Sequence, residues 1–208
     1  MLLLKDAQFS QLQEQIKPHF LFNALSTIVW KAYENNDEEV ASIADALGEM
    51  LRYPIHNTKK KITLEEEVRI LYDYLAIQKI RFKDRFSVMV DIQEDILDIL
   101  LPPFTLQPIV ENIFVHVVDK TLDFCSIHII GKVNEEEVQI VIEDSGDSMP
   151  SDAISKNNCV DTKKSGNGVG LQNIDSRIKL LYSDAYGITT ERKNGYSRVT
   201  VSVPRREK

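Results

Sequence analysis

A histidine in an unusual helical setting near the N-terminus is the first feature of this sequence that could do chemistry. Pro18 precedes His19 inside an amphipathic helical pattern. There a proline removes a backbone hydrogen bond and clashes with the carbonyl of Glu14, which costs roughly 3 kcal/mol. The neutral histidine ring can act as a nucleophile, and Asn23, four residues on, shares its helix face. The residues alone leave two interpretations open, a reactive imidazole or a core histidine beside a helix kink.

Three polar segments that contain glycine or asparagine follow downstream in order. They are LQPIVEN at 106–112 with His116 beyond it, VIEDSG at 141–146, and GNGVGLQN at 166–173. Together they resemble the N, G1 and G2 boxes of the GHKL ATPases. With QIKPHFLFN at 15–23 in front, and the linking stretch from LEEE to QKIRF at 64–82, the chain resembles the cytoplasmic kinase core of a LytS/YehU-type sensor histidine kinase. The resemblance runs from about Gln11 to Pro204.

The first two boxes imply a site for Mg-ATP. The resemblance gives Asn112 the role of a Mg²⁺ ligand, which suits an amide oxygen because Mg²⁺ binds oxygen and bridges substrate phosphates. It places His116 near the phosphates, although a buried structural histidine is an alternative. Asp144 is expected to accept the exocyclic amine of adenine, with Gly146 close to the base. The alternative for Asp144 is a turn-forming aspartate.

The third box implies the end of a lid that wraps the triphosphate. Gly166, Gly168 and Gly170 precede and open a helix, and a helix N-terminus offers free N–H groups to phosphate oxygens. The resemblance includes Leu171 in the same nucleotide-binding set. Arg177, on the helix that follows, matches a family arginine, and we expect it to form a structural salt bridge.

Several positions depart from the family pattern. Pro108 stands where hydrolytic members of the superfamily have a water-activating glutamate, which favours transfer to a protein acceptor over hydrolysis. Two roles remain open for Glu111, which either tunes the metal site or pairs with a basic neighbour. Ser148 replaces the second glycine of the G1 box, in a lid expected over residues 147–167. Phe20 follows His19 where other subfamilies carry an acid, so the proton acceptor is unassigned.

The function implied is an ATP:protein-histidine kinase of two-component signal transduction. His19, with Asn23 on the same helix face, would take the γ-phosphoryl group of ATP and pass it to an aspartate on the receiver domain of a response regulator. The alternative is a catalytically degenerate, nucleotide-gated dimerisation module. A GHKL ATPase unrelated to signalling is disfavoured by the motif around His19.

Composition excludes several other classes. The net charge of −7, from 25 basic and 32 acidic residues, disfavours a nucleic-acid partner, because phosphate neutralisation needs a basic face. Cys125 and Cys159 are too few for a disulfide framework or a metal site. No apolar run reaches the roughly 20 residues that span a bilayer. We therefore expect a soluble fragment, and the resemblance to a cytoplasmic kinase core implies that it lies on the cytoplasmic side of the plasma membrane. Membrane helices upstream, usual in the resembled family, would anchor the full-length protein.

The N-terminal elements are predicted to form a helical hairpin. Apolar residues at helical spacing begin at Phe9, a turn signal falls at 35–37, and a second apolar stripe ends near Tyr53 and Pro54. Two such helices bury one seam, and a second copy of the chain would bury the rest in a dimeric four-helix bundle. The alternative is that the helices pack on their own C-terminal domain. We assign residues 1–60 to dimerisation and histidine phosphotransfer, and residues 61–208 to ATP binding.

The C-terminal domain is predicted to be a GHKL-type α/β sandwich, with a mixed sheet on one side and helices on the other, so that the chain as a whole is α+β. Thr63 and Glu66 form a capping box for a helix that runs to about Phe82. Strands are expected over 86–92, 126–133 and 138–142, the last two as antiparallel neighbours, and a helix over 168–182. A closing hairpin turns at Asn194-Gly195.

Overall fold

The computed structural model describes residues 18–56, 60–146, 168–193 and 195–205. The chain divides into two compact units, residues 1–58 with 73–80, and residues 59–72 with 81–208. The first unit holds the helical hairpin and the second holds the sheet.

The hairpin consists of α2 (Pro18–Glu34) and α3 (Glu38–His56). Asn36, at a φ of 55°, makes the turn between them, and the Asp37 carboxylate accepts a 3.1 Å hydrogen bond from the Val40 N–H at the start of α3. Small residues are buried along the hairpin, namely Ala32, Ala41 and Ala44. The second helix was expected to end near Pro54 and continues to His56. The kink expected at Pro18 depends on residues outside the described ranges.

A capping box starts the second unit as predicted. Strand β1 (Ile62–Thr63) leads directly into α4 (Leu64–Phe82). The Thr63 N–H donates to Glu66 Oε2 and the Glu66 N–H donates to Thr63 Oγ1, both at 3.1 Å. Two short 3₁₀ turns, Lys83–Arg85 and Glu94–Ile96, flank the next strand. An unpredicted strand β3 (Leu100–Leu101) pairs with β1.

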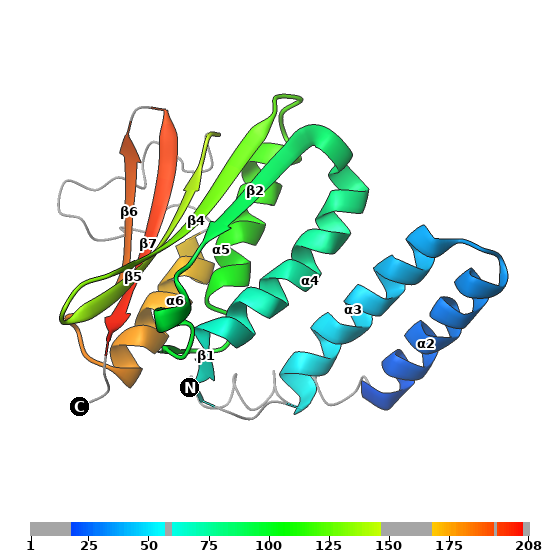
Figure 1. The fold of residues 1–208 in the computed structure, drawn as a ribbon, viewed down its shortest axis with the longest axis horizontal. Coiled ribbons are helices and arrows are strands. Elements are labelled where there is room, and N and C mark those ends of the chain that lie inside the picture. The colour runs from blue at the N-terminus through cyan, green and yellow to red at the C-terminus, as the bar shows by residue number, and fades with distance from the viewer. Residues whose placement is uncertain (1–17, 57–59, 147–167, 194, 206–208) are drawn as a thin grey trace, which may run out of the picture. The chain divides into compact units, whose positions relative to one another are not determined.

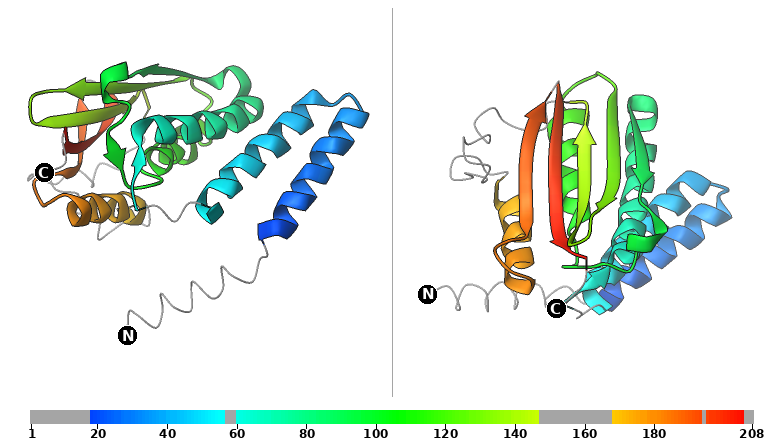
Figure 2. Two further views of the ribbon diagram at one scale, coloured as in Figure 1. Left: turned by 60° about the horizontal axis from the view of Figure 1, so that its bottom comes forward. Right: turned by 60° about the vertical axis from the view of Figure 1, so that its left-hand side comes forward.

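Five strands form one mixed sheet. They are β2 (Phe86–Asp91), β4 (Cys125–Val133), β5 (Glu137–Asp144), β6 (Gly187–Lys193) and β7 (Tyr196–Pro204), in the order β2-β4-β5-β7-β6. β2 pairs with β4 in parallel and the other pairs are antiparallel. Helices α5 (Leu106–Ile113) and α6 (Gly168–Leu181) lie on one face of this sheet (Figures 1 and 2). The predicted sandwich is thus confirmed.

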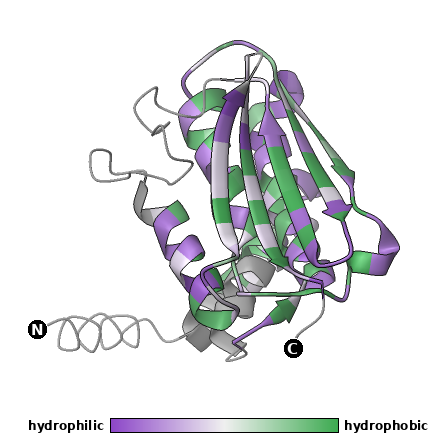
Figure 3. Cartoon of the chain, turned by 90° about the vertical axis from the view of Figure 1, so that its left-hand side faces the viewer, coloured by the Kyte–Doolittle hydropathy of each residue, from purple (hydrophilic) through white to green (hydrophobic). Residues whose placement is uncertain are grey.

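The core lies between that face and the helices. Hydrophobic residues alternate with polar ones along the strands (Figure 3), and alternate positions of β4, β5 and β7 are buried. The largest fully buried side chains there include Ile127, Ile129, Ile140 and Ile142. Alternation of this kind places one face of each strand against the helices and leaves the other face polar.

The closing hairpin and the helix before it also match the sequence-based expectation. β6 and β7 are antiparallel neighbours, and Gly195 in their turn has a φ of 82°, which favours glycine. The lid expected over residues 147–167, including Ser148, lies outside the described ranges.

Candidate functional site

The helix that carries Asn112 is capped at its start by a distant carboxylate. Thr105 is the N-cap residue of α5, but its hydroxyl donates to the Pro102 carbonyl at 2.6 Å and not to the helix. Instead Glu67 Oε2, from α4, accepts the N–H groups of Thr105 at 2.9 Å and of Leu106 at 2.8 Å. Pro108, in the first turn, has no N–H to satisfy. The start of α5 is therefore fixed by a contact 38 residues away in sequence.

Glu67 was not among the residues selected from the sequence. It is 1% exposed, and burial raises its pKa to about 7, against the opposing effect of the backbone N–H groups and of Arg177. The spacing of residues in α4 could have identified Glu67 from the sequence. Glu67 lies three residues after Leu64 and four before Leu71, both fully buried, so helical spacing puts this acid on the apolar face of α4.

Asn112 and His116 lie on consecutive turns of one helical segment, and both are half-buried. α5 ends at Ile113, and Phe114–Val118 continues as a π-helix. The sequence predicted a regular α-helix through both residues, whereas the structure has a wider π turn from Phe114 onward. Such turns often occur at functional sites. His116 Nδ1 lies 3.1 Å from Lys120 Nζ, so it has a basic neighbour one turn on.

Asp144 ends β5 with its side chain on the helix-covered face of the sheet, where it is 3% exposed. Its Oδ1 accepts the Gly146 N–H at 3.0 Å, so the carboxylate stabilises the turn as well. A Cβ placed on Gly146 would lie 2.1 Å from Val117 Cγ1. Val117 belongs to the π-helical turn, so the absence of a side chain at Gly146 lets the G1 segment approach the N-box helix.

The glycines of the third box are described in part. Gly168 is the first residue of α6, as expected for a helix that opens within the box, and Gly166 lies outside the described ranges. Gly170 is exposed, with nothing within 4 Å of an added Cβ, and Leu171 is half-buried. Arg177 donates a hydrogen bond to the Pro103 carbonyl, next to the start of α5. Burial lowers the pKa of Arg177, and attraction to Glu67 opposes that change.

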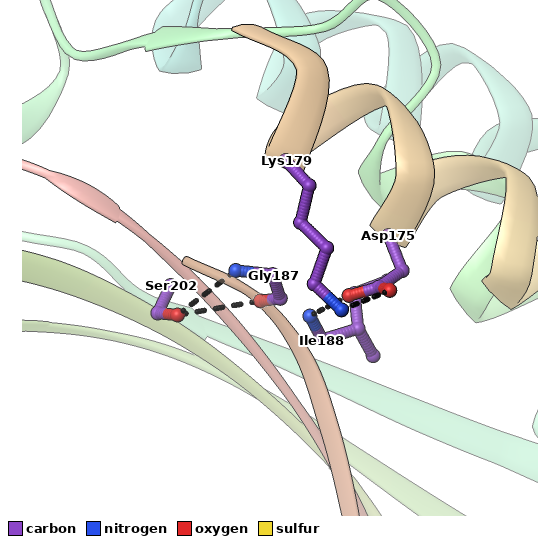
Figure 4. A network of polar contacts seen from close by, with 5 residues as sticks. All are labelled: Asp175, Lys179, Gly187, Ile188 and Ser202. Atoms are coloured by element: carbon purple, nitrogen blue, oxygen red, sulfur yellow. Dashed lines mark hydrogen bonds and ion pairs between the residues drawn. The ribbon is translucent and has the colours of Figure 1, made fainter. Parts of the chain in front are cut away.

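Polar contacts anchor α6 to the edge of the sheet (Figure 4). Asp175 Oδ1 accepts the Ile188 N–H at 2.9 Å, and its Oδ2 pairs with Lys179 Nζ at 2.7 Å. Ser202 Oγ lies 3.3 Å from both the N and the O of Gly187, which joins edge strand β6 to its neighbour β7. The contacts of Asp175 hold α6 against β6. The first turn of α6 is the segment that the sequence predicts to meet the triphosphate of ATP.

The proposed phosphoacceptor belongs to the other unit. The backbone of His19 lies in α2, and its side chain is outside what the structure describes. Asn23 is exposed, and its carbonyl accepts the Thr27 hydroxyl at 2.7 Å.

Comparison with known proteins identifies the family. A family model described as Histidine kinase matches residues 7–86. The sensor histidine kinase YesM of Bacillus subtilis is 34% identical over 98% of this chain, and the sensor histidine kinase BtsS of Escherichia coli is 31% identical over 99%. The chain belongs to the histidine kinase family. It spans about one third of each of these relatives, 34% and 35% of their lengths.

A solved structure supports the fold of this histidine kinase chain. The catalytic domain of the histidine kinase ThkA aligns with a TM-score of 0.52 and 19% sequence identity, over 70% of this chain and 96% of that domain. At that identity the likeness concerns architecture alone. Within the described ranges, no helix is long and apolar enough to cross a bilayer.

Proposed function

We propose that this chain is the kinase core of a sensor histidine kinase, which binds Mg-ATP, transfers the γ-phosphoryl group to His19 and then passes it to a response regulator aspartate. The observation that carries the proposal is the position of Asp144. Its carboxylate, 3% exposed, ends a core strand beside a glycine that packs on the N-box helix. The membership of the chain in the histidine kinase family supports the same conclusion.

Adenine recognition is assigned to Asp144 and Gly146. A carboxylate oxygen accepts the exocyclic amine of adenine, whereas guanine presents a carbonyl oxygen at that position and would repel it. Asp144 is buried, so a purine without the amine would lose a buried hydrogen bond to the carboxylate and bind more weakly. Gly146 is assigned a place beside the base through its backbone, because Val117 already fills the direction that a side chain would take.

The phosphates are assigned to the start of α6 and to Asn112. The free N–H groups around Gly168 and Gly170 are the donors that phosphate oxygens need. No group of three or more His, Cys, Asp or Glu side chains within the described parts of the chain could hold a metal ion. An amide oxygen at Asn112, completed by substrate phosphates and water, is a donor set that Mg²⁺ accepts. When bound, Mg²⁺ neutralises the charge on the phosphates, and His116 is assigned as a further polar group near them.

Transfer to His19 needs mainly positioning. A ring nitrogen of the neutral imidazole forms a bond to the γ-phosphorus while the bond from that phosphorus to the bridging oxygen breaks, and ADP leaves. Asn23 is assigned to hydrogen-bond to the ring, because residues four apart in a helix share a face. The absence of a glutamate at the position of Pro108 disfavours hydrolysis as the competing reaction.

The partners are assigned on the same basis. Trp30 and Tyr33 of α2 are 73% and 62% exposed, and large apolar side chains at such positions favour a second copy of the hairpin as partner. The receiver domain of a response regulator would accept the phosphoryl group. A membrane anchor upstream of this segment is part of the proposal, because the resembled family usually carries one.

Radiolabelling tests the proposal. After incubation with γ-labelled ATP, the wild-type chain should carry acid-labile, base-stable label, and His19→Gln should carry none while retaining Mg-ATP affinity and the fold. His128→Gln, a half-buried histidine on β4, is the matched control and should label normally. Label on His19→Gln at the wild-type rate would move the acceptor elsewhere. A wild-type chain that binds Mg-ATP but takes up no label would favour the degenerate module.

A further inference from the structure

The N-box segment, which is α5 with the π turn that follows it (residues 106–118), is held at both ends by charged side chains. The proposed function gives these side chains no role. At its start, the carboxylate of Glu67 accepts two N–H groups, at the end of a helix where the macrodipole is positive. At its end, the guanidinium of Arg85 donates to the carbonyls of Val118 and Thr121, where the dipole is negative. Glu67 lies near the start of α4, and Arg85 three residues after its end. Charges of the favourable sign thus reach both ends of the segment that contains Asn112.

The cap at Glu67 also reaches α6. Arg177 donates to the carbonyl of Pro103, two residues before Thr105, and attracts the Glu67 carboxylate. Arg177 is nine residues after Gly168, on the helix whose first turn is assigned to the phosphates. One buried carboxylate therefore connects the helix assigned to the metal with the helix assigned to the triphosphate.

We propose that Glu67 is a positioning residue of the nucleotide site: its ionised carboxylate fixes the start of α5 and, through Arg177, sets the distance between Asn112 and the glycines of α6. The role rests on the proposed binding of Mg-ATP. Glu67 itself touches neither nucleotide nor metal.

Protonation of the Glu67 carboxylate should weaken this cap. Burial raises the pKa of Glu67 to about 7, so the carboxylate changes charge near neutral pH. Arg177 is the only charged group that acts on it among those described. A protonated carboxyl accepts hydrogen bonds less strongly from two N–H groups and loses its attraction to Arg177. Affinity for Mg-ATP should therefore fall as the pH falls below about 7, beyond the change caused by ionisation of ATP itself.

Titration calorimetry with Mg-ATP at pH 8 and pH 6 tests the inference on the full chain. At pH 8 Glu67→Gln should bind about tenfold more weakly than wild type, because the amide has lost the charge but kept the shape. At pH 6 the affinities of the two proteins for Mg-ATP should become similar. Glu65→Gln, which removes an exposed carboxylate from the same turn of α4, is the control and should follow wild type at both pH values. Ligand ionisation is common to all three proteins and cancels in the comparison.

A second measurement needs no nucleotide. Amide hydrogen exchange should give lower protection factors at Thr105 and Leu106 in Glu67→Gln than in wild type at pH 8, by more than tenfold. If the glutamine variant does not fold, Glu67→Asp, which keeps the charge but shortens the reach, should show the same loss in part. Unchanged protection and an unchanged ratio of affinities between the two pH values would overturn the positioning role. A wild type with no affinity for Mg-ATP, but with the protection difference present, would instead overturn the proposed function.

Discussion

At the end of β5, one carboxyl group serves both the chain and the proposed ligand. Asp144 Oδ1 already accepts the Gly146 N–H, which is the turn-forming role that the sequence also allowed. The two interpretations are compatible, because a carboxylate has two oxygens and about four lone-pair positions. Burial decides that the group matters, since an aspartate in an ordinary turn is exposed.

Removing that carboxylate should impair nucleotide binding. We expect Asp144→Ala to weaken Mg-ATP affinity by more than tenfold, over about 1.4 kcal/mol, because a buried hydrogen bond to the base is lost. Titration calorimetry measures the change. Asp91→Ala, on an exposed position of edge strand β2, should leave affinity as in wild type. Unchanged affinity in Asp144→Ala would limit this residue to its turn.

Gly146 is required for the close approach of the π-helical turn. A methyl group at Gly146 would overlap Val117, so Gly146→Ala should destabilise the chain by about 1–3 kcal/mol, as overpacked cores do. The double variant Gly146→Ala/Val117→Ala should be less destabilised than the sum of the two single variants, because the second change removes the overlapping methyls. Denaturant unfolding measures all four proteins. Strict additivity would show that the overlap is not the cause.

At the scale of elements, the position of α6 depends on its contact with β6. Asp175 accepts the backbone N–H of Ile188, a residue that is only 6% exposed, and Gly187 beside it has no room for a side chain because a Cβ would lie 2.3 Å from Asp175 Oδ1. The adjacent pair with Lys179 is partly exposed and contributes little. The hydrogen bond from the Ile188 N–H to Asp175 is therefore the contact in Figure 4 that contributes most to stability.

Substitutions at Asp175 separate these two contributions. Asp175→Ala should lower the free energy of unfolding by about 1–3 kcal/mol, because the buried N–H of Ile188 is left without an acceptor. Asp175→Asn keeps a carbonyl oxygen and loses only the charge, so it should be clearly less destabilised. Thermal and denaturant unfolding of both variants decides. Equal losses in the two would assign the effect to the pair with Lys179.

The pH dependence of stability belongs to the same scale, through the cap of α5. The pKa of Glu67 is raised from 4.5 to about 7 in the folded chain, so the folded state binds its proton more tightly than the unfolded state. Stability contributed by this group is therefore greatest below about pH 4.5 and falls as the pH rises to about 7. Wild type compared with Glu67→Gln by denaturant unfolding across that range should show this slope, and Glu65→Gln should not change it.

At the scale of the whole molecule, the hairpin leaves apolar surface that its own seam does not cover. The buried residues Ala32, Ala41 and Ala44 are small, whereas Ile28, Trp30, Tyr33 and Val40 are exposed. A second hairpin packed on this surface would complete the four-helix bundle predicted from the sequence.

The state of association tests that bundle. The chain should be a dimer in light scattering over a concentration series, and a chain without residues 8–56 should be a monomer that still binds Mg-ATP. The affinity of the shortened chain for Mg-ATP is the control that it has folded. A full chain that stays monomeric at the highest concentration would contradict the bundle.

Local patterns were sufficient to determine most elements of this chain. The capping box at Thr63 and Glu66, the antiparallel strands β4 and β5 and the closing hairpin with its glycine at Gly195 each follow from patterns of a few residues, and each is confirmed. The family was also determined by the sequence, because the boxes occur in order. The roles of their residues stay predictions, as do the domain boundaries at 60 and 61.

Only the tertiary structure decided how the boxes meet. The cap of Glu67 on α5, the packing of Gly146 on Val117, and the hydrogen bond from Arg177 to Pro103, in place of a simple salt bridge, join residues between 29 and 74 positions apart. The pairing of β1 with β3 and the π turn after Asn112 were not predicted either. The physical reason is that periodicity shows which face of an element is buried, but the partner across the core depends on how all the elements pack together.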